Sequence, residues 1–253
     1  MSAVTLTERQ SRKLMEFLRT CKGIYVGNES KTLQFIAAIL WIVRSGSPWE
    51  LLPAQYGKWN SVYKRFARWC ERSIWQQMHA HFAADPDLEW LLLDSTIIRA
   101  HPCAAGAPAK QGGQAAQALG RSRGGFSSKI HIVVDALGNP LDFVLTAGQV
   151  HDLKQAPTLL QGRTCDYVIA DKGYDADALL ALIEAMGAIP VIPARKNRTE
   201  PRPLDAHLYK ERHLVECFIN KIKWYRRIFS RFDKLASRFL GFLSFVSTLI
   251  WLR

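Results

Sequence analysis

Three acidic residues stand where a carboxylate can do chemistry. Asp94 and Asp171 each end a short apolar run, W-L-L-L and Y-V-I-A, of the kind that forms a buried strand. Glu216 lies among cations in a stretch that can form a helix. A carboxylate at the end of a buried strand is costly unless it is paired or binds a metal. The three acids are therefore candidates for one metal site built from oxygen ligands.

The stretch around Glu216 separates into two faces when it is placed on an α-helix at about 100° per residue. One face is polar and the opposite face is apolar, as expected for a helix packed on a core. The polar face holds Tyr209, Arg212, Glu216, Asn220, Lys223 and Arg227, and the apolar face holds Leu214, Phe218, Ile222, Tyr225 and Phe229. The alternative interpretation is a solvated face with i,i+4 pairs such as Arg212 with Glu216.

The charge of the chain points to a polyanionic partner. The formal net charge is +12, and residues 195–253 hold 14 Lys and Arg against 5 Asp and Glu. A concentrated positive surface is typical of proteins that bind nucleic acid. Attraction to a membrane surface, or plain solubility, is the alternative.

The cysteines and the apolar segments restrict the class of protein. The 5 cysteines are scattered without a C-x-x-C pair, which argues against a zinc ribbon and a disulfide framework. A reducing, cytoplasmic location is expected. The N-terminus has no apolar signal region. The apolar stretch 239–252 is shorter than the roughly 20 residues that a membrane span needs, so we expect a packed terminal helix and no membrane partner.

Residues 1–84 are predicted to form a small all-helical domain. Helical patterns end near Gly23 and at Ser45-Gly46, and a basic, aromatic helix follows Asn60 or Ser61. A helix, a turn and a basic helix resemble a helix-turn-helix reader of DNA. The outward-facing cations of the last helix, Lys64, Arg65 and Arg68, are then candidates to contact DNA. Packing of three helices without a ligand is the alternative.

Asp85-Pro86-Asp87 marks the expected boundary to a second domain at 88–253. Strands are predicted over 88–98, 127–134, 141–146, 167–170 and 189–192, with the second and third forming a hairpin. Asp175 is expected to cap a helix that Gly187 ends. The Gly- and Ala-rich stretch at about 100–126, with Arg121 and Arg123, is expected to be a flexible loop. This order predicts an α/β fold with antiparallel strands before parallel ones.

Two histidines in this second domain have plainer interpretations than catalysis. His131 lies within an apolar strand, which is typical of a core histidine. His151 and Asp152 lie in a loop and could line the site, although a structural hydrogen bond is the simpler expectation.

These residues together resemble the DDE transposases of bacterial insertion sequences, in the branch of families four and five marked by Y-x2-R-x3-E-x6-K. The motif is complete here as Tyr209, Arg212, Glu216 and Lys223. Asp94 in L-L-L-D-S-T and Asp171 in I-A-D-K-G-Y-D resemble the two aspartates of the catalytic triad. The similarity extends from about residue 31 to residue 224.

The resemblance implies an RNase H-like catalytic core, a mixed sheet flanked by helices, preceded by the small helical, helix-turn-helix-like domain. Asp94, Asp171 and Glu216 would be the catalytic acids and would bind two Mg²⁺ ions, with Mn²⁺ able to substitute. Contacts to DNA are expected from basic and aromatic residues of several segments, namely Tyr209, Arg212, Lys223, Arg227, Arg195, Lys196, Arg198, Arg121, Arg123, Lys64, Arg65 and Arg68.

The expected function is that of a Mg²⁺-dependent transposase, which cleaves DNA at the ends of an insertion sequence and joins the 3′-hydroxyl ends to target DNA. Its partner would be double-stranded DNA, as terminal inverted repeats and target, bound by a homodimer in the synaptic complex. A bacterial cytoplasmic location, at the nucleoid when bound, follows from that function. The alternative is an inactive or repurposed transposase that acts as a DNA-binding repressor.

Overall fold

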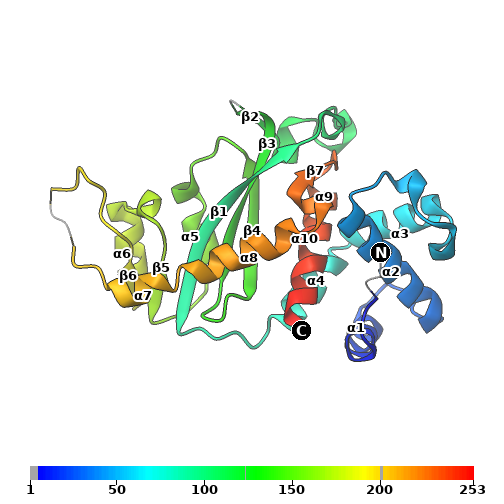
Figure 1. Cartoon of the computed structure of the whole chain (residues 1–253), viewed down its shortest axis with the longest axis horizontal. Helices are drawn as coiled ribbons and strands as arrows, with labels where there is room; N and C mark the ends of the chain where they lie inside the picture. The colour runs from blue at the N-terminus through cyan, green and yellow to red at the C-terminus, as the bar shows by residue number, and fades with distance from the viewer. Residues whose placement is uncertain (1–4, 123, 200–201) are drawn as a thin grey trace. The chain divides into compact units, whose positions relative to one another are not determined.

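The computed structural model describes residues 5–122, 124–199 and 202–253. The chain divides into two units, whose elements are labelled in Figure 1. The sheet unit comprises Asp85–Ala100 and Ala107–Lys221. The helical unit comprises the chain up to Ala84, His101–Gly106 and Ile222–Arg253.

A mixed sheet forms the centre of the sheet unit. Its main strands follow the order β2-β3-β1-β5-β6, and β4 also pairs with β3. β3 runs antiparallel to β1 and to β4, whereas β5 runs parallel to β1 and β6 runs parallel to β5. The strands are β1 (Trp90–Ala100), β2 (Gly120–Ser122), β3 (Gly125–Val134), β4 (Pro140–Ala147), β5 (Tyr167–Ile169) and β6 (Ile189–Val191).

Helices cover this sheet. α5 packs against β3 and β4, and α6 packs against β6. α8 lies across the sheet in Figure 1, and its Phe218 ring stacks on Phe143 of β4 at 5.9 Å between centroids. The helical elements of the unit are η4 (Ala109–Gln111), η5 (Ala115–Gln117), η6 (Asp152–Lys154), α5 (Ala156–Leu160), η7 (Lys172–Tyr174), α6 (Asp177–Ala185), α7 (Ala206–Lys210) and α8 (His213–Lys223).

The sequence explains the shape of this sheet. β3 is buried at every position from Ser127 to Val134, as expected for a strand that is covered on both faces. The hairpin between β3 and β4 turns at Asp135, whose carboxylate accepts hydrogen bonds from the amides of Leu137 and Asn139 at 3.0 and 2.7 Å. The mixed sheet with flanking helices confirms the predicted α/β fold.

Aromatic packing holds the helical unit together. α10 packs against α3 and α4, and the Phe242 ring of α10 stacks on Phe66 of α3 at 4.3 Å. In the same helix, the absence of a side chain at Gly241 lets α10 lie close to Cys70 and Trp75. The elements are α1 (Glu8–Thr20), α2 (Glu29–Ser45), η1 (Trp49–Leu51), η2 (Ala54–Tyr56), α3 (Trp59–Glu71), α4 (Ile74–Phe82), η3 (Pro102–Ala104), α9 (Arg226–Phe229), β7 (Ser230–Arg231) and α10 (Ala236–Trp251).

The units differ from the predicted domains at the C-terminal end. The terminal helix α10 was predicted within a domain spanning 88–253, but it packs on the N-terminal helices because its apolar faces meet α3 and α4. The stretch 100–126, predicted as a flexible loop, contains η3, η4, η5 and the short strand β2.

Two helical predictions also need correction. α2 and α3 are separated by residues 46–58 with two 3₁₀ turns, which is longer than the 3–4-residue turn of a helix-turn-helix. The predicted helix over 209–223 is interrupted between α7 and α8. No helix in the described parts of the chain combines the length and the apolarity needed to cross a bilayer.

The packing at Gly241 gives a prediction for stability. A Cβ at this position would lie 2.6 Å from Cys70 Sγ and 3.1 Å from Trp75 Cδ1. We expect Gly241→Ala to lower the free energy of unfolding by about 1–3 kcal/mol, as overpacking does, despite a helix-propensity gain of about 1 kcal/mol. Urea unfolding measures the change. Ser237→Ala in the first turn of α10 is the control and should stay within about 0.5 kcal/mol. Unchanged or increased stability of Gly241→Ala would contradict the packing.

Candidate active site

The register of two parallel strands brings Asp94 and Asp171 to neighbouring positions. Leu92 of β1 pairs with Ile169 of β5, and each aspartate lies two residues beyond its member of that pair. Adjacent strands are about 4.8 Å apart, so two residues beyond the pair the chains are still neighbours. The prediction that both acids follow buried strand segments is confirmed, because residues 91–93 and 168–170 are buried.

Arg212 connects the first aspartate to the glutamate. Its Nη1 donates to Asp94 Oδ2 at 3.1 Å, and its Nη2 donates to Glu216 Oε1. The planar guanidinium has donors on both sides, so one side chain can hold two carboxylates. Arg212 lies just before α8 and Glu216 is in its first turn, which places the helix against β1 at the level of Asp94.

The pKa of the Asp94 carboxyl reflects its burial and its charged neighbours. Burial raises the pKa of the Asp94 carboxyl, and the Asp171 and Glu216 carboxylates raise it further. The amide of Ser95, at 2.7 Å, and the Arg212 guanidinium oppose this rise in pKa. A cation therefore stabilises the charged form of Asp94, and in this structure the guanidinium has that role.

The pKa of Arg212 reflects the same contacts. Burial alone would lower it, but the carboxylates of Asp94 and Glu216 outweigh burial and raise it above the ordinary value. Arg212 is therefore a permanent cation at this site.

A short turn orients the carboxylate of Asp171. Asp171 is the N-cap of the 3₁₀ turn η7, and its Oδ1 accepts a hydrogen bond from the amide of Gly173 at 2.7 Å. A Cβ on residue 173 would lie 2.8 Å from that same oxygen. A side chain at position 173 would therefore displace the Asp171 carboxylate from this place.

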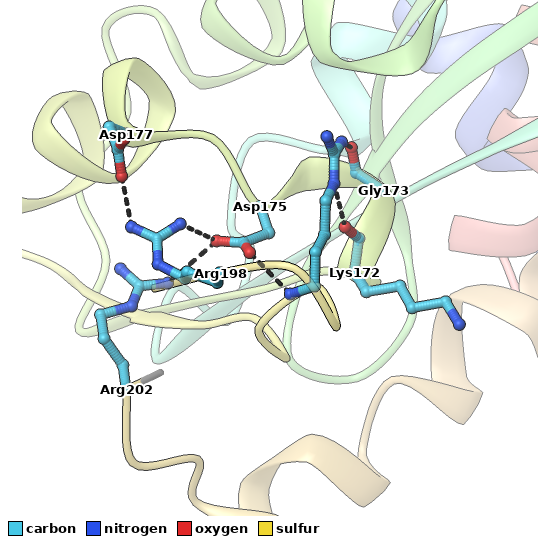
Figure 2. Close-up of polar contacts among 7 residues, drawn as sticks. Lys172, Gly173, Asp175, Asp177, Arg198 and Arg202 are labelled. Atoms are coloured by element: carbon cyan, nitrogen blue, oxygen red, sulfur yellow. Dashed lines mark hydrogen bonds and ion pairs between the residues drawn. The ribbon is translucent and has the colours of Figure 1, made fainter. Parts of the chain in front are cut away.

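The basic loop after β6 folds onto this turn, as Figure 2 shows. The Asp175 side chain is only 1% exposed and accepts from the Arg195 amide at 2.8 Å and from Arg198 Nη1 at 2.5 Å. Arg202 Nη2 lies 3.7 Å from the same carboxylate, and Arg198 also pairs with Asp177. The prediction that Asp175 caps α6 is wrong, because Ala176 is the N-cap and the Asp175 carboxylate serves the loop.

A second polar cluster, which is partly buried, joins β3 to η6. Lys129 Nζ is 3.0 Å from Asp152 Oδ1, and His131 Nδ1 is 3.4 Å from the same oxygen. His131 Nε2 lies 2.8 Å from Thr146 Oγ1, which confirms the expected core histidine. Burial raises the pKa of Tyr174, and the carboxylates of Asp152, Asp94 and Asp171 raise it further.

The donor set of the site suits a hard divalent cation. Asp94, Asp171 and Glu216 supply carboxylate oxygens, which Mg²⁺ prefers, and burial with like charges leaves Asp94 in need of a positive partner. Within the described ranges, however, no group of three or more His, Cys, Asp and Glu side chains is already arranged to hold a metal ion. Arg212, rather than a common centre, joins Asp94 to Glu216.

The predicted DNA contacts have different surroundings. Tyr209 lies in α7 and is half-buried. Lys223 is also half-buried, at the end of α8 and two turns after Glu216. Lys64, Arg68, Lys196 and Arg121 are exposed, and the Arg121 guanidinium lies 5.2 Å from the centroid of the Phe126 ring. Arg123 lies outside the described residues.

Two of these predictions are corrected by burial. Arg227 is 5% exposed, and its Nε and Nη2 donate to the Asp233 carboxylate at 3.1 and 3.0 Å, so it is not available to DNA. The helical phase fails here because α8 ends at Lys223 and the chain turns before α9. Arg65 does not face outward either.

The position of Arg65 follows from its aromatic neighbours. Its guanidinium lies over the rings of Phe35 and Trp69, at 4.4 and 5.2 Å from their centroids, and donates to Thr32 Oγ1 at 3.1 Å. Burial and the neighbouring Arg68 lower its pKa. Cation–π packing against α2 therefore accounts for this side chain.

Comparison with known proteins assigns relatives to both parts of the chain. The family model described as "Transposase DDE domain" matches residues 85–248, and "Putative transposase of IS4/5 family" matches residues 6–79. A protein of Brucella ovis, "Putative transposase for insertion sequence element IS6501", is 44% identical over 130 residues, which are 51% of this chain and 100% of that protein. "Uncharacterized protein y4sN" of Sinorhizobium fredii is 43% identical over 88 residues, 35% of this chain and 70% of that protein.

Among solved structures, the chain is similar to one described as "Cryo-EM structure of piggyBac transposase synaptic complex with hairpin DNA (SNHP)". The TM-score is 0.44 and the identity 12%, over 76% of this chain and 48% of that one.

The buried His131 gives a prediction for pH dependence. Burial lowers its pKa to about 4, and Lys129 adds to this, while Asp152 opposes it. The unfolded chain therefore binds a proton at His131 that the folded chain does not bind between about pH 6.5 and 4. The contribution of His131 to the free energy of unfolding is present above pH 6.5 and is lost as the pH falls. For this residue the loss is about 2 kcal/mol from pH 7 to pH 5.

Urea unfolding at pH 7 and pH 5 measures this loss. His131→Gln should reduce the pH-dependent difference, whatever its stability at pH 7, and His207→Gln at an exposed position should not. An equal pH dependence in the unaltered chain and in His131→Gln would contradict the assignment.

Proposed function

Because the chain belongs to the DDE transposase family, we propose that it cuts DNA at the ends of an insertion sequence and joins the freed 3′-hydroxyl ends to target DNA. The observation that carries this proposal is geometric: Asp94 and Asp171 follow paired positions of two neighbouring parallel strands, and one guanidinium, that of Arg212, contacts both Asp94 and Glu216. Family membership supports the proposal that those three acids are the catalytic set, and it agrees with the resemblance carried by Tyr209, Arg212, Glu216 and Lys223.

The three acids would hold divalent ions, Mg²⁺ or Mn²⁺, two in each active site. When bound, such ions activate the attacking oxygen and stabilise the leaving oxygen of an in-line displacement at phosphorus. The attacking group is first water and then the 3′-hydroxyl of the element end. Asp94 and Asp171 supply ligands from the sheet, and Glu216 supplies one from α8.

Arg212 and Lys223 would hold the phosphate backbone of the DNA. Both belong to the polar side of the segment that carries Glu216, and a phosphate contact fixes the register of DNA without reading its sequence. Before DNA binds, Arg212 neutralises Asp94 and Glu216. A phosphate group would therefore compete with the two carboxylates for its donors, and the cations would replace it at the acids.

Each unit carries further exposed cations. Lys196 and Arg121 in the sheet unit, and Lys64 and Arg68 in the helical unit, are exposed and are proposed to contact double-stranded DNA. We expect the terminal inverted repeats and the target to be bound by a homodimer. The net charge of +12 supports electrostatic attraction to DNA that weakens with salt.

Isosteric substitution of the acids tests the proposal. We expect Asp94→Asn, Asp171→Asn and Glu216→Gln each to lower cleavage of a labelled duplex carrying the terminal repeats of the encoding element. The loss should exceed about 100-fold, more than residues that only support a metal ligand usually cause. Glu184→Gln, at an exposed position of α6, is the control and should keep full activity.

Gel-shift binding of the same duplex should persist in all four variants. Full cleavage by any one of the three acid variants would remove that acid from the catalytic set. Binding by the unaltered chain without cleavage in Mg²⁺ or Mn²⁺ would contradict the proposed reaction.

A further inference from the structure

Arg195 and the carboxylate of Asp171 lie on opposite sides of one peptide group. Arg195 Nε donates to the carbonyl of Lys172 at 3.2 Å, and the amide of Gly173, in the same peptide, donates to Asp171 Oδ1 at 2.7 Å. Because a peptide group is planar, a bond that fixes its carbonyl also fixes the direction of its N–H. Arg195 Nη2 adds a bond to the next carbonyl, that of Gly173, at 2.8 Å.

The buried Asp175 holds Arg195 in this place. Its carboxylate accepts from the Arg195 amide at 2.8 Å and from Arg198 at 2.5 Å (Figure 2). A carboxylate with a side chain 1% exposed is stable only when it is paired and hydrogen-bonded, so the loop that provides these donors is required by the fold. The turn after Asp171 is thus fixed by two sets of contacts. The Arg195 side chain bonds to two carbonyls of the turn, and the Asp175 carboxylate, which directly follows the turn, bonds to the Arg195 amide.

These contacts change the expected role of two basic residues in the loop. Arg195 and Arg198 were predicted to bind DNA, and both guanidinium groups already have partners on the turn that follows Asp171. Lys196, between them in the same loop, is exposed and carries the same charge. The chain therefore offers a positioning cation and a surface cation at adjacent positions.

We propose that Arg195 is a positioning residue for Asp171, which acts through the Lys172–Gly173 peptide and depends on Asp175 for its own placement. The proposal rests on the proposed function, because it takes Asp171 as a metal ligand. The physical role is to fix one Asp171 oxygen on the Gly173 amide, so that the carboxylate needs less ordering when a cation binds.

Binding of Mn²⁺ to the full chain without DNA, measured by calorimetry, tests this role apart from activity. Arg195→Ala should weaken Mn²⁺ binding about tenfold, the scale typical for partners of metal ligands. Arg195→Lys should recover part of the loss, since an ammonium can still reach a carbonyl. Lys196→Ala removes the same charge from the same loop and should leave Mn²⁺ affinity unchanged while it weakens DNA binding.

Gly173→Ala tests the same positioning of Asp171 without a change of charge. Its Cβ would displace the Asp171 oxygen, so it should weaken Mn²⁺ binding by a similar factor. Thermal unfolding of each variant shows whether the fold is kept, and Asp171→Asn defines the loss of the ligand itself.

The outcomes separate the inference from the proposed function. Unchanged Mn²⁺ affinity in folded Arg195→Ala, with binding lost in Asp171→Asn, would overturn the positioning role and leave the metal site intact. Equal weakening by Arg195→Ala and Lys196→Ala would also overturn it, since general charge would then be the cause. Unaltered binding by Asp171→Asn would overturn both the metal site and the positioning role.

Discussion

The partly buried carboxylate of Asp94 is the constraint on which the rest of the site depends. Asp94 is partly buried beside Asp171 and Glu216, so its charged form is disfavoured by burial and by two like charges. The fold meets this cost with the guanidinium of Arg212, which contacts Asp94 and Glu216 together. The site therefore contains its own cation, at the carboxylates that the proposed divalent ions would occupy.

The acids are positioned by three elements, β1, β5 and α8, and packing in the core fixes each of these elements. β1 and β5 lie side by side because their apolar residues pair in parallel register, which sets the places of Asp94 and Asp171. α8 is held against the sheet by the contact of Phe218 with Phe143, which fixes the helix that carries Glu216. Packing of apolar faces thus determines where the charges meet.

Local patterns were sufficient to predict this part of the structure. Asp94 and Asp171 could be found because an acid after an apolar run is conspicuous, and the periodicity around Glu216 placed its helix. The interruption between α7 and α8, and the end of α8 at Lys223, could not be predicted from periodicity. For this reason Arg227 was assigned to the polar face, whereas its guanidinium is buried against Asp233.

The ion pairs of the basic loop gave no local signal. Asp175 and Arg198 are 23 residues apart, and nothing in either neighbourhood distinguishes this pairing from a helix cap or a DNA contact. Likewise, α10 was assigned to the catalytic domain because sequence order could not show that its apolar faces meet α3 and α4. Contacts between distant segments decide these cases.

Diffraction from crystals of the full chain soaked in Mn²⁺, recorded at the manganese absorption edge, tests the central claim most directly. The account predicts anomalous density coordinated by oxygens of Asp94, Asp171 and Glu216, with the Arg212 guanidinium withdrawn from at least one of the carboxylates that it holds. Manganese bound elsewhere, or bound here without one of the three acids, would contradict it.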